Sequence, residues 1–114
     1  MLSGMAQGEL SEECKQKLRN IDYGLANATE LLLGGASLLP PALAYNLIDS
    51  FYAIQTVDDP CAQVHRQIDQ SAGAMSLVSR LQAGFTSPTR FDQENLLQHI
   101  SRIREEIEFH LRQN

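Results

Sequence analysis

Few side chains of this sequence are spaced for acid-base or metal chemistry. The chain holds three histidines, at His65, His99 and His110, and no two of them form the HxxxH pair that brings two ligands to one helix face. His110 follows Glu106 by four residues, which favours an ordinary pair on a helix surface. No Gly-x-Ser-x-Gly elbow and no nucleophilic Cys/His motif is present. We therefore expect a protein that is not an enzyme and uses no metal or cofactor.

The two cysteines, Cys14 and Cys61, are far apart, and each falls on an apolar helical stripe. Free cysteines are among the most buried residues and behave as small apolar side chains. A disulfide framework is typical of small secreted domains with several conserved-looking pairs. We therefore predict two reduced thiols inside the core.

The charge balance disfavours nucleic acid as a partner. The chain has 9 Lys and Arg residues against 14 Asp and Glu residues, a formal net charge of -5. Affinity for nucleic acid comes largely from Lys and Arg that replace counterions on phosphates. The basic residues are also scattered among acidic ones at helical spacing, as in Arg102 with Glu106 and Arg104 with Glu108, which indicates charged outer helix faces.

The elements that must position these side chains are helices. Apolar or small residues recur in steps of three and four between residues 14 and 32, which marks one face of a helix. Ser11 fits as the N-cap of this helix, and the pair Gly34–Gly35 ends it. Three further helices are predicted over about 40–57, 60–84 and 91–112. No segment alternates in the manner of a strand.

The sequence thus predicts an all-α fold, a four-helix bundle-like small domain that is dimeric. Residues 1–10 are expected to be a flexible N-terminus and residues 11–114 a single helical domain. Asp58 or Asp59 can cap the third helix. The small residues SAGAMS, 71–76, at the centre of that helix would let a neighbouring helix come close.

The uncharged stretch LLLGGASLLPPALAYNLI, residues 31–48, invites a membrane interpretation. A spanning helix needs about 20 predominantly apolar residues in one piece. The pairs Gly34–Gly35 and Pro40–Pro41 would interrupt such a helix twice. We therefore interpret the stretch as a helix end, a turn and a helix start, with Ser37 as a possible cap, and expect no membrane partner.

The helix predicted over 40–57 is apolar most of the way round. Such a helix must be buried on several sides. Either it is the central helix of a compact bundle, or part of its surface is kept for a twin subunit or another protein. We favour the second interpretation, in which Asp in place of Leu47 or Phe51 abolishes binding. The expected partner-binding residues are Leu38, Leu39, Leu43, Tyr45, Leu47, Ile48, Phe51, Tyr52 and Ile54.

In size, acidity, helical pattern and the apolar segment SLLPPALAYNLIDSFYAI, residues 37–54, the chain resembles the small helical anti-activators of bacterial quorum sensing, of the QslA type. The resemblance implies a cytoplasmic homodimer that binds a LuxR-type transcription regulator and blocks its dimerisation or DNA binding. The first residues lack the basic and apolar regions of a secretory signal, which also favours the cytoplasm.

Other functions stay open on the residues alone. A secretion chaperone or an antitoxin-like binder would share the same outline of a small acidic helical protein with an apolar face. A small-ligand-binding bundle, in which Tyr45, Tyr52, His65 or Met75 line a cavity between helices, is a further alternative.

Overall fold

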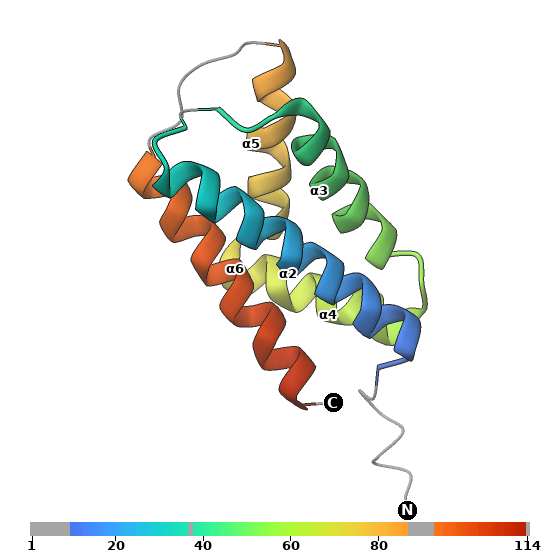
Figure 1. Ribbon diagram of the computed structural model, residues 1–114. Helices are drawn as coiled ribbons and strands as arrows, with labels where there is room; N and C mark the ends of the chain where they lie inside the picture. Colours follow the sequence, from blue (N-terminus) through green and yellow to red (C-terminus); the bar gives the residue numbers. More distant parts are fainter. Residues whose placement is uncertain (1–9, 37, 87–92, 114) are drawn as a thin grey trace, which may run out of the picture.

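The computed structural model describes residues 10–36, 38–86 and 93–113. The regular structure in these ranges is entirely helical, which confirms the all-α fold. None of the helices in the described ranges combines the length and the apolarity needed to cross a membrane. In chain order the helices are α2 (Glu12–Leu33), α3 (Pro41–Ile54), α4 (Asp59–Ala72), α5 (Ala74–Thr86) and α6 (Gln93–Gln113) (Figure 1).

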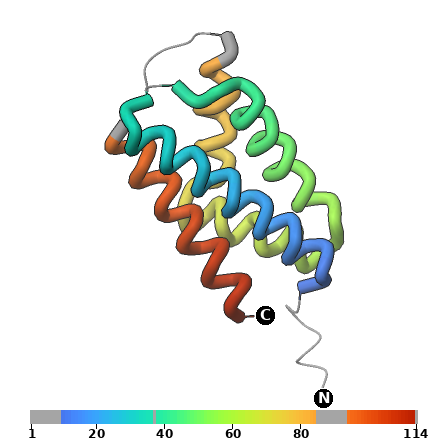
Figure 2. The backbone as a smooth tube through the Cα atoms, viewed as in Figure 1, coloured from blue at the N-terminus to red at the C-terminus, as the bar shows by residue number. Residues whose placement is uncertain are grey.

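The helices form two layers. In Figures 1 and 2, α2 lies between α3 and α6 and runs antiparallel to both, while α4 and α5 lie behind them. The apolar stripe predicted for the first helix faces the space between the layers, and all six of its members are fully buried. They are Cys14, Leu18, Ile21, Leu25, Ala28 and Leu32. Burial of this continuous stripe contributes to holding the two layers together.

Two predicted N-caps are formed. The Ser11 side chain accepts a hydrogen bond from the backbone N–H of Cys14 at 3.1 Å. The Asp58 carboxylate accepts one from the backbone N–H of Cys61 at 2.9 Å. Each cap satisfies one of the backbone donors that a helix start leaves without a partner inside the helix. Both cysteines therefore occupy the same position, the third residue of a capped helix.

The prediction of one helix over 60–84 is wrong, because Gly73 divides it into α4 and α5. Gly73 has φ 71° and ψ 47°, the left-handed conformation that ends a helix and that glycine adopts at little cost. Asp69 then caps the next helix, since its Oδ1 atom accepts a hydrogen bond from the backbone N–H of Met75 at 2.8 Å. Figure 1 shows α5 leaving α4 in a new direction. The bundle thus has five helices in the described ranges where four were expected.

The prediction of two reduced thiols is also wrong, because Cys14 and Cys61 form a disulfide bond. Their Cα atoms lie 5.8 Å apart, within the range that a disulfide spans. Both residues are buried, as expected, but the starts of α2 and α4 meet there. Apart from this bond, α2 packs mainly against α3 and α6 rather than α4. The sequence could not show the pairing, because 47 residues separate the two cysteines.

Parts of three predictions fall outside the described residues. Of the N-terminus expected to be flexible, residues 1–9 lie outside, and Leu10 is buried in the core. Ser37, a candidate cap, and the turn residues 87–92 also lie outside. The N-cap position of α3 is occupied by Pro40, which offers no side-chain hydrogen bond.

Candidate functional site

The nine predicted partner-binding residues do not form one surface. Most of them are used by the core of the chain itself, so the central-helix interpretation holds for the inner face of α3. Leu43 is half-buried against that core. The exposed members are Leu38, Tyr45 and Tyr52. The buried members are Leu39, Leu47, Ile48, Phe51 and Ile54.

The close approach of α2 and α3 depends on Gly24. A Cβ atom placed on Gly24 would lie 2.9 Å from Cδ2 of Leu47, closer than carbon atoms can pack. Because glycine has no side chain, Leu47 fits directly against the backbone of α2. Leu43 lies one turn away along the same side of α3 and also borders Gly24. The two helices therefore meet closely at this point.

A hollow of about 320 Å³ opens on the outer side of this contact. We call it the α2–α3 groove. Four residues of α2 line it, namely Asn20, Tyr23, Gly24 and Asn27, and four of α3, namely Leu43, Asn46, Leu47 and Ser50.

Among the residues that the structure describes, none with a charged side chain lines the α2–α3 groove, although the chain carries a net charge of -5. Its polar groups are amides and hydroxyls, and Tyr23 beside them is 72% exposed. Centres of protein interfaces are depleted in charged residues and enriched in tyrosine, which combines a large apolar body with a polar tip. The composition of the groove therefore suits contact with another protein.

Tyr45 and Tyr52 lie on the other side of α3. They are seven residues apart, about two turns, so they share one face of the helix. Leu43, in the groove, precedes Tyr45 by two residues. The side chains of these two residues therefore point about 200° apart around the axis of α3. A single partner surface would therefore have to wrap around α3 to include both the groove and the two tyrosines.

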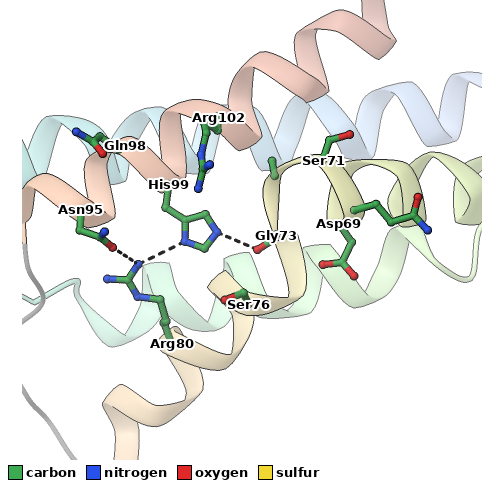
Figure 3. Close-up of a pocket in the computed structure, with 11 residues that line it drawn as sticks. Asp69, Ser71, Gly73, Ser76, Arg80, Asn95, Gln98, His99 and Arg102 are labelled. Atoms are coloured by element: carbon green, nitrogen blue, oxygen red, sulfur yellow. Dashed lines mark hydrogen bonds between the residues drawn. The ribbon is translucent and has the colours of Figure 1, made fainter.

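A second hollow, of about 400 Å³, lies at the corner where α4 turns into α5 and α6 crosses it (Figure 3). We call it the corner pocket. It is polar, and α5 and α6 contribute its two arginines. The lining residues are Asp69, Gln70, Ser71, Ala72, Gly73, Ser76, Arg80, Asn95, Gln98, His99 and Arg102.

His99 of α6 contacts both the α4–α5 corner and α5 through its ring nitrogens. Its Nε2 atom lies 2.9 Å from the carbonyl oxygen of Gly73, so Nε2 carries the proton and donates to that oxygen. Nδ1 is then an acceptor, and it faces Nη1 of Arg80 at 3.4 Å. Arg80 Nη1 also donates to Oδ1 of Asn95 at 3.1 Å. The dashed lines in Figure 3 follow this chain of contacts from α6 to the corner and to α5.

The other two histidines have lowered pKa values. Burial lowers the pKa of His65, and the nearby Asp69 offsets part of this effect. Nε2 of His65 is buried and has no hydrogen-bond partner among the described residues. Burial also lowers the pKa of His110, against the opposing charge of Glu106. Within the described ranges, no three His, Cys, Asp or Glu side chains are grouped so as to hold a metal ion.

The cavity expected from the small-ligand alternative is not one of these two hollows, because Tyr45, Tyr52, His65 and Met75 line neither of them. Sequence reasoning also missed the residues that do line the α2–α3 groove from α2. The one available signal was Gly24, a glycine inside a long apolar-periodic helix, which points to a close helix contact.

These observations define the class of the protein as a small all-α domain with a disulfide between two helix starts, an uncharged groove and a polar corner pocket. Comparison of the chain with protein-family models, with curated proteins and with solved structures finds no match.

Proposed function

We propose that the protein is a non-enzymatic regulator that binds another protein in the α2–α3 groove. The observation that carries the proposal is the uncharged lining of the groove on an otherwise acidic chain, with Tyr23 exposed at its edge. Covering the groove removes water from no charged side chain among its described lining residues, and burial of charge is among the main costs of forming an interface. Among the predicted partner-binding residues, the half-buried Leu43 is the one that this proposal retains in the groove, and the exposed Asn46 follows it by three residues.

The partner class in this proposal is a LuxR-type transcription regulator, as implied by the resemblance to QslA-type anti-activators. Binding would block dimerisation or DNA binding by that regulator, in the cytoplasm. The disulfide between Cys14 and Cys61 counts against a cytoplasmic location, because such bonds persist mainly in oxidising compartments.

The test places a charge in the groove. Asn46 is exposed and lines the groove, so Asn46→Arg leaves the core intact and puts a cation where a partner would have to desolvate it. We expect the parent protein to reduce the binding of a purified LuxR-type regulator from the same host to its operator DNA in a gel-shift titration. Asn46→Arg should lose this effect by at least about tenfold, a change of about 1.4 kcal/mol in the binding free energy.

Gln63→Arg is the matched control, because Gln63 is exposed on α4, outside the groove, and the substitution adds the same charge. It should act as the parent does. Tyr23→Ala removes apolar area without adding charge and should weaken the effect as well. Equal loss in both arginine variants would mean that net charge, not the groove, governs the interaction. No effect of the parent on any host regulator of this type would overturn the anti-activator function, and a stable complex with another host protein would favour the chaperone or antitoxin alternative.

A further inference from the structure

Hydrogen bonds hold the side chains on the inner wall of the corner pocket in place. His99 is buried and bonded at both ring nitrogens, to Gly73 on one side and to Arg80 on the other. A Cβ atom on Gly73 would lie 3.2 Å from Nε2 of His99, so the glycine also leaves room for the ring. Asn95 fixes Nη1 of Arg80 from the far side. The Arg80 guanidinium is therefore positioned by α6 before any ligand arrives.

A second guanidinium borders the same hollow. Arg102 follows His99 by one turn of α6, and Figure 3 shows both side chains extending from α6 toward the corner. The pair predicted between Arg102 and Glu106 is not formed, and Arg102 makes no hydrogen bond or ion pair with the residues that the structure describes. By contrast, Arg104 is held by Asp22 at 2.9 Å and by Glu108 at 3.7 Å. Arg102 is thus available to a ligand.

The charge of the corner pocket is the reverse of the charge of the chain. Among the described residues, its lining carries two arginines against one carboxylate, that of Asp69, whereas the whole chain has a net charge of -5. The Oδ1 atom of Asp69 is already used by the backbone N–H of Met75. Ser71 and Ser76 add two hydroxyl groups that can donate hydrogen bonds. Arg102, Ser71 and Ser76 therefore offer donors to the hollow, and its described lining has one charged acceptor, Asp69.

We propose that the corner pocket binds the oxyanion group of a small molecule, a phosphate or a carboxylate, between Arg80 and Arg102. Guanidinium groups bind these anions through paired, charge-assisted hydrogen bonds, and the volume of about 400 Å³ is that of a small-ligand site. The bound anion would join α5 to α6 across the corner. The corner pocket and the α2–α3 groove have no lining residue in common, so this site is independent of the proposed function.

The test uses inorganic phosphate as the probe and succinate as the carboxylate probe. Each is titrated into the full chain while backbone amide NMR shifts are recorded, with sodium chloride at equal ionic strength as the reference. We expect saturable shifts at Gly73, Ser76 and Arg102 and no change at Asn46 in the groove. Saturation by phosphate alone would identify a phosphate-bearing ligand, and saturation by succinate alone a carboxylate.

Two variants decide whether the arginine pair is responsible. Arg102 is exposed, so Arg102→Gln should keep the fold while its affinity for the probe falls by about tenfold or more. Arg19→Gln removes the same charge from an exposed position of α2 outside the pocket and should bind as the parent does. Shifts that do not saturate with either probe, or that are equal in the two variants, would overturn the proposal. Asn46→Arg should bind the probe normally, which separates this result from the test of the groove.

Discussion

His65 is a titratable side chain packed into the core without a hydrogen bond for its Nε2 atom in the described part of the chain. A buried imidazole loses hydration more readily when it is neutral than when it is protonated. Burial has the largest effect and disfavours the protonated form, Asp69 favours that form in part, and Arg66 disfavours it further. The result is a pKa below the ordinary value of 6.5.

This lowered pKa predicts that acid weakens the fold. Between pH 6.5 and the lower folded pKa, the unfolded chain binds more protons at His65 than the folded chain does, so the free energy of unfolding falls as the pH falls. The slope contributed by one histidine is at most about 1.4 kcal/mol per pH unit. Urea unfolding at pH 7.5 and 5.5 measures the difference.

His65→Leu serves as the comparison for this measurement, because it replaces the ring by an apolar side chain and removes both the titration and the unpartnered nitrogen. The variant should show a smaller loss of stability between the two pH values. It keeps a residual loss from His110, whose pKa is also lowered by burial. An unchanged pH dependence in His65→Leu would mean that other groups govern the response to acid.

Single residues also mark the limit of what the pattern could predict. Phe51 was assigned to a partner surface, yet it is 1% exposed and belongs to the core. Apolar residues on all sides of a helix show that it is buried, but not which neighbours bury it. The structure implies that Phe51→Asp would unfold the chain, so this variant cannot report on binding. Tyr23, which does line the groove, stands among polar residues of α2 and gave no apolar signal.

At the scale of elements, the sequence predicted the start of α2, the start of α4 and the buried faces of both, because caps and apolar periodicity are local. It did not predict the break at Gly73. The apolar positions continue through residues 60–84 as if there were one helix, and a glycine inside a helical pattern is often tolerated. The direction of α5 depends on residues distant in the chain, because α5 packs mainly against α3.

The disulfide between the starts of α2 and α4 should contribute strongly to stability. A bond that closes a loop of 47 residues removes chain entropy from the unfolded state worth about 4 kcal/mol in the loop-closure description. α2 has few other contacts with α4, so little else replaces this link. Reduction should therefore lower the midpoint of urea unfolding. The free energy of unfolding should fall by up to about 4 kcal/mol.

The comparison for that measurement is the double variant Cys14→Ala and Cys61→Ala, unfolded with and without reductant. It should match the reduced parent and should not respond to reductant. Alkylation of the unfolded, unreduced parent should first show no free thiol. A parent with two free thiols after aerobic purification, or one whose unfolding is the same in reductant, would contradict the bond or its contribution.

For the whole molecule, the sequence predicts a homodimer, and two copies that covered the α2–α3 groove of each other would compete there with another protein. Two copies that each carry a net charge of -5 repel each other, and contact through an uncharged groove keeps that repulsion smallest. Sedimentation equilibrium should give a mass that rises with concentration from 12.7 kDa toward twice that value. Added salt should favour the larger species, because it screens the repulsion.

Asn46→Arg should hold the protein at the monomer mass, while Gln63→Arg should associate as the parent does. If the parent stays at 12.7 kDa at every concentration, the groove does not mediate self-association and is accessible to a different protein. If both variants still associate, the contact lies elsewhere, and the face of α3 that carries Tyr45 and Tyr52 becomes the surface to change next.

The bond from Cys14 to Cys61 also determines how the molecule would respond to mechanical force. All residues that line the α2–α3 groove lie between these two cysteines, inside a ring of chain closed by sulfur. A pull on the two ends of the chain passes through that bond, so tension does not stretch the ring. An optical trap would record an extension shortened by the 47 residues of the ring, at about 3.6 Å each, and reductant would restore that length.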